Sequence, residues 1–216
     1  LPFEPKFLHN PKAEDLINEI KKPENRGRIH WLHLACFSVD MFFGYRVYAL
    51  LELLDFQENI KGVFLNLCDA SPVAEWLSHL GVGCAIGGVG KISDDYAVKS
   101  SIDFYSRLMG GSGIEEAFSS ILIPTEENDS APHRGFSIAR ELQGPGYELY
   151  IAPWALDYFQ KWRLHQSDRY LFATLIGINA YPKNPLNGCV QDALELDTFL
   201  RKLCLQQSGG ALTYAP

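Results

Sequence analysis

The chain has little of what would mark a nucleic-acid-binding or membrane protein. Its 216 residues carry a net charge of −7 and contain no run of Lys or Arg, which argues against a nucleic-acid surface. No apolar stretch approaches the ~20 residues of a membrane span, and the first residues lack the basic start and apolar stretch of a signal peptide. Hydrophobic residues make up 47% and charged residues 21%, so we expect an ordinary globular protein of one large or two small domains.

Disulfide and metal signatures are also missing. The five cysteines form no CxxC pair and are irregularly spaced: Cys36, Cys68, Cys84, Cys189 and Cys204. An odd number of cysteines, mostly in apolar runs, predicts reduced thiols and a cytoplasmic location. His30 and His33 are close together, but no second pair at ligand spacing accompanies them. We therefore predict no metal site.

Nucleotide motifs fail on spacing. In the glycine-rich stretch 81–91, a phosphate loop would need Gly at position 85 and Ser or Thr at position 92, where the chain has Ala85 and Ile92. A dinucleotide fingerprint would need Gly where Ile86 stands. We read the stretch as a strand and a tight turn, and we predict no cofactor.

Strand and helix patterns alternate along the chain, which predicts an α/β fold with a mostly parallel sheet and helices on both faces. Strands are expected at 29–36, 61–67, 83–88, 147–152 and 170–178. Helices are expected at 47–54, 72–80, 93–109, 113–122, 155–165 and 190–203, with Ser71 and Ser93 as caps of the second and third. The polar stretch 124–134 is expected to be a loop, and 166–168 a boundary.

Cys68 ends the apolar run 63–68 and precedes a polar break and a helix that starts near Pro72. Binding and chemistry collect at the carboxyl ends of strands in open α/β sheets. A thiolate is also stabilised near a helix N-terminus. Cys68 is therefore a candidate nucleophile, although a free cysteine often only fills space in a core.

A cysteine nucleophile needs a base within hydrogen-bond reach. The strand before Cys68 contains His30 and His33, but neither lies at its carboxyl end, and a histidine on an apolar strand is more often a core residue. His33 is the nearest candidate for the base.

Four segments in order resemble the later part of a caspase-like CHAT domain: RIHWLHLACFS, VFLNLCDASPVAEWL, GVGCAIGGVGKISDDYAV and FYSRLMGGSGIEEAF. The resemblance covers about residues 1–122 and implies that Cys68 is the nucleophile of a cysteine endopeptidase. In that family a His-Gly pair ends the preceding strand and supplies the base. Those positions hold Phe37 and Ser38 here. Phenylalanine cannot accept a proton, and a lost base lowers acyl-transfer rates by about 10² or more.

The tail carries a second resemblance. LFATLIGINAYPKNPLNGCVQDALELDTFL looks like the first strand, loop and helix of a metacaspase-type domain. The resemblance implies that Asp192 helps to form an acidic pocket for a substrate Arg or Lys side chain, which a carboxylate at a helix start would suit. The alternative is that Asp192 only favours the first helical turn through the dipole.

Two domains are therefore expected: a CHAT-like domain over residues 1–165, and the start of a truncated metacaspase-like domain over 166–216. We also considered that the strand 170–178 docks beside 29–36 and completes the first sheet in permuted order, with Asp192 near Cys68. The missing Met and abrupt end favour an excised piece of a longer chain.

The function expected from these patterns is a caspase-like cysteine endopeptidase module, weakened by Phe37. The alternative is a catalytically inactive protein-interaction module on the same fold, and a small-ligand α/β domain is disfavoured by the failed glycine spacings. The expected partners are a protein or peptide substrate and further domains of a longer chain, with no nucleic acid and no membrane.

Overall fold

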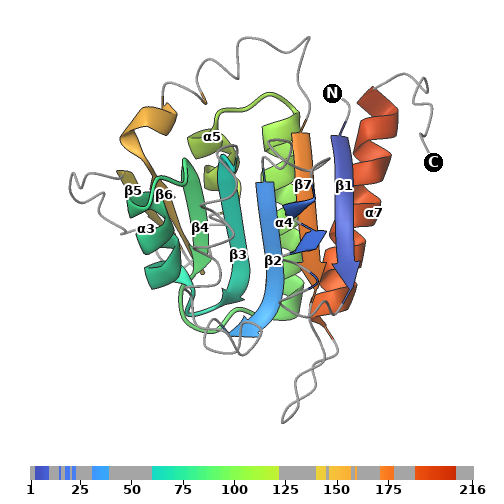
Figure 1. Cartoon of the computed structure of the whole chain (residues 1–216), viewed down its shortest axis with the longest axis horizontal. Coiled ribbons are helices and arrows are strands. Elements are labelled where there is room, and N and C mark those ends of the chain that lie inside the picture. Colours follow the sequence, from blue (N-terminus) through green and yellow to red (C-terminus); the bar gives the residue numbers. More distant parts are fainter. Residues whose placement is uncertain are drawn as a thin grey trace.

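One seven-stranded sheet runs through the structure, a computed structural model (Figure 1). It describes residues 3–9, 15, 18–19, 21–22, 31–38, 60–121, 140–144, 146–156, 159, 171–177 and 188–207. The strands are β1 (Phe3–His9), β2 (Trp31–Ser38), β3 (Gly62–Cys68), β4 (Cys84–Gly88), β5 (Arg140–Gly144), β6 (Tyr147–Ile151) and β7 (Leu171–Gly177).

The sheet order is β1-β7-β2-β3-β4-β6-β5. The strands from β1 to β4 pair in parallel, whereas β6 pairs antiparallel with both β4 and β5. The predicted α/β class with a mostly parallel sheet is therefore confirmed.

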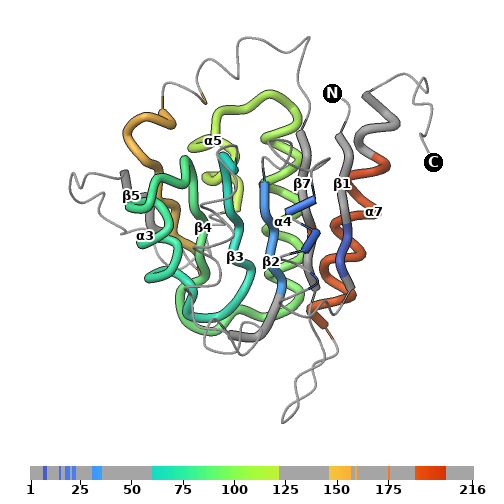
Figure 2. Tube along the Cα trace, in the orientation of Figure 1, coloured from blue at the N-terminus to red at the C-terminus, as the bar shows by residue number. Residues whose placement is uncertain are grey.

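Helices cover both faces of the sheet (Figure 1). On one face, α3 (Ser71–His79) packs against β4 and β6. On the other face, α4 (Asp94–Met109) and α5 (Ile114–Ser119) share a core with the central strands, and α7 (Cys189–Gln207) packs against β1, β7 and β2. Residues 60–121, which include β3 and α5 and all elements between them, form the longest continuous stretch of described residues (Figure 2).

Side chains of β3 alternate between the two faces, as a pleated strand requires. Val63, Leu65 and Leu67 belong to the core on the α3 side, and Phe64 belongs to the core on the α4 side. Asn66 and Cys68 share the α4 side with Phe64, since they follow it at intervals of two. The nucleophile candidate therefore faces the same layer as α4 and α7.

The C-terminal strand lies inside the same sheet as the rest of the chain. β7 pairs in parallel with β2, where Trp31 is opposite Ala173 and Ala35 is opposite Gly177, and on its other side it pairs with β1. The prediction that this strand docks beside β2 is confirmed. Since β7 is parallel to β3, the helix that follows it begins at the carboxyl edge, where Cys68 also lies.

Most predicted elements agree with the structure within one or two residues, but α7 ends at Gln207 rather than 203, α5 ends at Ser119 rather than 122, and further details differ. Ser71 does not cap α3: Ala70 is the cap residue, and Ser71 is the first helical residue. The Ser71 hydroxyl instead donates to Glu148 and lies 2.8 Å from the Tyr150 hydroxyl. It therefore bonds to side chains of β6 rather than to the first turn of the helix. Neither edge strand was expected: β5 has the polar sequence RELQG, and β1 has the sequence FEPKFLH, which contains a proline.

Other predictions fall where nothing is described. The helix at 47–54, most of the helix at 155–165, the loop at 124–134, the boundary at 166–168 and His30 lie outside the described residues, as do the side chains of Phe37 and Ser38.

Candidate active site

Cys68 is the last residue of β3 and is half-buried at the carboxyl edge of the sheet. Its sulfur accepts a hydrogen bond from the Ile92 backbone N–H at 3.4 Å, and its thiol lies 3.9 Å from the Ile92 carbonyl oxygen. Ile92 directly precedes Ser93, the cap of α4, whose hydroxyl accepts from the Tyr96 N–H as predicted. The sulfur is therefore held against the start of α4 rather than α3.

A close backbone approach makes this arrangement. A Cβ on Gly88 would collide with the Leu67 carbonyl oxygen and with the Ile92 side chain, so only glycine lets the segment after β4 fold over the end of β3. Asp69, next to Cys68, has a φ of 54°, and its N–H donates to the Gly90 carbonyl at 3.1 Å. The turn that follows Cys68 is thus fixed by the loop that leads into α4.

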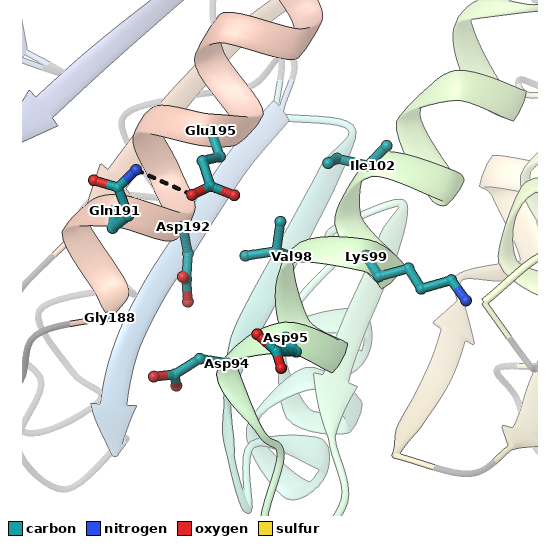
Figure 3. Close-up of a pocket in the computed structure, with 9 residues that line it drawn as sticks. All are labelled: Asp94, Asp95, Val98, Lys99, Ile102, Gly188, Gln191, Asp192 and Glu195. Carbon is teal, nitrogen blue, oxygen red and sulfur yellow. Dashed lines mark hydrogen bonds between the residues drawn. The ribbon is translucent and has the colours of Figure 1, made fainter.

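An acidic pocket of about 430 Å³ lies between the first turns of α4 and α7 (Figure 3). The apolar side chains of Val98 and Ile102 line part of it. Four carboxylates also line it, two from each helix: Asp94, Asp95, Asp192 and Glu195. Lys99 also lines the pocket, but Figure 3 shows its side chain extending away from Asp192. The excess of negative charge over an apolar wall suits a cation with an aliphatic body.

Asp192 is the most buried of these acids. Only 9% of its surface is exposed, and its carboxylate extends into the gap between the helices, toward Asp94 (Figure 3). Within the described ranges, no hydrogen bond or ion pair reaches this carboxylate. Burial, and then the charges of Asp94, Glu195 and Asp95, raise the pKa of Asp192 to about 7. The carboxyl group thus has unmet capacity to bind a cation.

Cys68 and the pocket both adjoin the start of α4: the Cys68 sulfur contacts Ile92, and Asp94, two residues further along the chain, lines the pocket with Asp192. Burial raises the pKa of the Cys189 thiol to about 12, and Asp192, Asp94 and Cys68 are among the further causes. Burial also raises the pKa of Tyr147 well above its usual range, with smaller contributions from Tyr96, Asp192 and Cys68. Cys189 is thus held as a neutral thiol, and Cys68 and the pocket belong to one region.

The structure does not bring His33 to Cys68. His33 pairs with Phe64, four residues before Cys68 on the neighbouring strand, and a strand advances by about 3.3 Å per residue. Its ring is 1% exposed, its Nδ1 lies 3.4 Å from the Tyr105 hydroxyl, and burial lowers its pKa to about 3. His33 is therefore a core residue, which agrees with the expectation that a histidine on an apolar strand is more often part of the core.

Two neighbours of the site were not anticipated. Asn66, two residues before Cys68 on the same face, is buried and accepts a hydrogen bond from the Tyr147 hydroxyl of β6. Its Nδ2 donates to Ala97 O at 3.3 Å and to Ser101 Oγ at 3.2 Å, both on α4. The polar break in the run VFLNLC could have indicated Asn66, but no local pattern indicates Tyr147.

No group of three or more His, Cys, Asp or Glu side chains could hold a metal ion in the part of the chain that is described. No helix there is both long and apolar enough to cross a membrane.

Comparison with known proteins gives no relationship: no protein-family model matches the sequence, and no curated protein matches it significantly. The resemblance to caspase-like peptidases therefore stays a prediction.

Proposed function

We propose that the chain is a caspase-like cysteine peptidase module of the CHAT type, with Cys68 as the nucleophile. The observation that carries the proposal is the shared location of Cys68 and the acidic pocket, at the carboxyl edge of a mostly parallel sheet. The substrate is a peptide whose Arg or Lys side chain enters the pocket and pairs with Asp192.

The arrangement of the elements also supports this proposal. The strand β2, the nucleophile strand β3 and the glycine-rich strand β4 are consecutive in the sequence and adjacent in the sheet, as the resemblance implies. We further propose that residues 166–216, which resemble the first strand and helix of a metacaspase-like unit, belong to one domain with the CHAT-like residues 1–165, because β7 lies between β1 and β2 in a single sheet.

The reaction would be acyl transfer. The Cys68 sulfur adds to the peptide carbonyl, the C–N bond breaks, and the thiol proton leaves on the departing amine. Water then hydrolyses the thioester and releases the carboxylate and the free thiol. The Asp69 N–H already binds Gly90 O, so it is not a free donor for the developing oxyanion.

Weak turnover is part of the proposal. Phe37 stands at the position where the resemblance implies a base, and His33 lies in the core. The N–H of Ile92 donates a hydrogen bond to the sulfur but cannot remove its proton. Loss of a general base costs about 10²–10⁴ in rate.

A non-catalytic peptide-binding module is the second candidate. The same Phe37 favours it, together with the burial of His33. Such a module would use the acidic pocket to bind a basic peptide segment without cleaving it.

Turnover of fluorogenic peptides separates these candidates. Peptides with Arg, Lys or Asp before the scissile bond should be assayed with the full chain and with Cys68→Ala. We expect slow cleavage of the Arg and Lys peptides only, and its loss in Cys68→Ala. Binding of basic peptides without turnover would favour the second candidate. Cleavage that persists in Cys68→Ala, or equal cleavage of the Asp peptide, would contradict the proposed site.

A further inference from the structure

Tyr147 contacts both the strand that ends in Cys68 and the helix α4, which forms one wall of the acidic pocket. It is the first residue of β6, its side chain is completely buried, and it lies on the α4 side of the sheet. Its ring stacks on Tyr96 of α4 at 5.7 Å and contacts Phe64 of β3 edge-on at 5.3 Å. Tyr147 thus bridges the nucleophile strand and the helix that forms one wall of the pocket.

The hydroxyl of Tyr147 completes a buried hydrogen-bond network through Asn66. It donates to Asn66 Oδ1, while Asn66 Nδ2 donates to Ala97 O and to Ser101 Oγ of α4. Both hydrogens of the amide and its oxygen are thereby engaged. A fully satisfied polar network in a core fixes the relative position of the elements that it joins.

The two ends of this network lie next to the two parts of the site. Asn66 is two residues before Cys68 on the same face of β3, and Ala97 is one helical turn after Asp94 on α4. A change at this hydroxyl should therefore alter how the pocket lies relative to the sulfur, without contacting a ligand.

We propose that Tyr147 is a positioning residue that, through Asn66, holds the α4 wall of the acidic pocket in register with the Cys68 sulfur. The inference rests on the proposed function, since it concerns the alignment of a bound cationic side chain with the nucleophile. Tyr147 itself is not a catalytic residue, because its hydroxyl is engaged by Asn66.

The alignment can be measured by labelling Cys68 with two peptidyl chloromethyl ketones that differ only in the residue beside the ketone. One probe carries arginine and the other norleucine, a neutral side chain. The ratio of their second-order rate constants reports the benefit of the cationic group, and mass spectrometry locates the label. Iodoacetamide is too small to need the pocket, so its rate constant reports the intrinsic reactivity of the thiol.

We expect Tyr147→Phe to lower the arginine-to-norleucine ratio by about five- to tenfold, the effect of one buried hydrogen bond. The iodoacetamide rate should change by less than about twofold. Tyr150→Phe is the matched control, because Tyr150 lies on the same strand but bonds to Glu148 and Ser71 on the opposite face. The control should keep the wild-type ratio.

A ratio that is unchanged in Tyr147→Phe, with a wild-type ratio well above one, would overturn this inference and leave the proposed function standing. A wild-type ratio of one would overturn the cationic pocket itself. If Tyr147→Phe fails to fold by circular dichroism, Ser101→Ala decides. It removes a smaller part of the same network and should lower the ratio by about two- to threefold; an unchanged ratio would again refute the role of the network.

Discussion

The two ends of the strand pair β2–β3 have opposite characters. At the amino-terminal half, His33 lies among Trp31, Phe64 and Tyr105, with ring centroids 5.1 Å apart for His33 and Phe64. At the carboxyl end, Asn66 and Cys68 meet backbone groups and hydroxyls of the loop and helix around α4. A few residues along one strand therefore separate a dry aromatic core from a polar edge.

This difference explains why the two candidate residues lie in different surroundings. His33 and Cys68 are both reactive residue types on adjacent strands, but only Cys68 lies at the edge where the helices begin. Burial removes the charge of a titratable group unless a partner offsets the desolvation cost. Position along the strand, rather than residue type, decides which of the two can take part in chemistry.

The burial of His33 in the aromatic core should lower the stability of the protein in acid. This is the larger of the two stability effects expected here. The folded protein keeps His33 neutral down to a pKa of about 3, against an ordinary value of 6.5. The unfolded chain binds this proton first, so stability falls as the pH falls from about 6.5 toward 3. At pH 5 the loss from this residue should be about 2 kcal/mol relative to pH 7.5.

Urea unfolding at pH 7.5 and pH 5 measures this effect. His33→Leu should remove the loss, whatever its own offset in stability, and should leave the labelling rate of Cys68 unchanged. His79→Gln, a change at an exposed histidine of α3, controls for the removal of a histidine. An equal acid loss in His33→Leu would mean that His33 is not buried in solution as it is here.

The acidic pocket should respond to pH with the opposite sign and a smaller effect. The folded state raises the pKa of Asp192 from 3.8 to about 7, so it holds a proton that the unfolded chain releases. Stability should therefore fall as the pH rises from about 4 to 7. The side chain is nine-tenths buried by area, but it borders a cavity, so solvent screening reduces the effect to about 1–2 kcal/mol.

Asp192→Asn mimics the protonated acid and should be more stable than the wild type at pH 8, by about the same 1–2 kcal/mol, and equal to it at pH 4. Thermal unfolding in the absence of added cations compares the two. Glu116→Gln, on the exposed surface of α5, removes one negative charge elsewhere and controls for the change in net charge. Lower stability of Asp192→Asn at pH 8 would imply that the carboxylate has a partner in the folded protein.

Local patterns account for the central elements and for part of the site. The alternation in β3 and the Ser93 cap of α4 are encoded within a few residues, and Cys68 and Asp192 could be singled out by their positions after a strand and at a helix start. The role of Ser71 could not be predicted from a local pattern, because its hydroxyl bonds to Glu148, 77 residues away. Tyr147 bonds to Asn66, 81 residues away in the sequence. Such contacts depend on the sheet order, which places β6 beside β4 and two strands from β3.

His33 shows a further limit of sequence patterns. Strand periodicity assigns a residue to one face of the sheet, but it does not tell how far that residue lies from the strand end. The pairing of His33 with Phe64, and the helix α4 that covers both, determine its depth. The same limit applies to β5, whose polar sequence carries no strand periodicity and forms a strand because β6 pairs with it.

The central claim is that Cys68 and the Asp192 pocket form one site, and selective labelling in Asp192→Asn tests it most directly. With the arginine and norleucine chloromethyl ketones described above, the account predicts that the wild-type preference for arginine falls at least about tenfold in Asp192→Asn, as expected when a buried charge pair is lost. The iodoacetamide rate should stay within about twofold. An unchanged preference for arginine in Asp192→Asn would contradict the account.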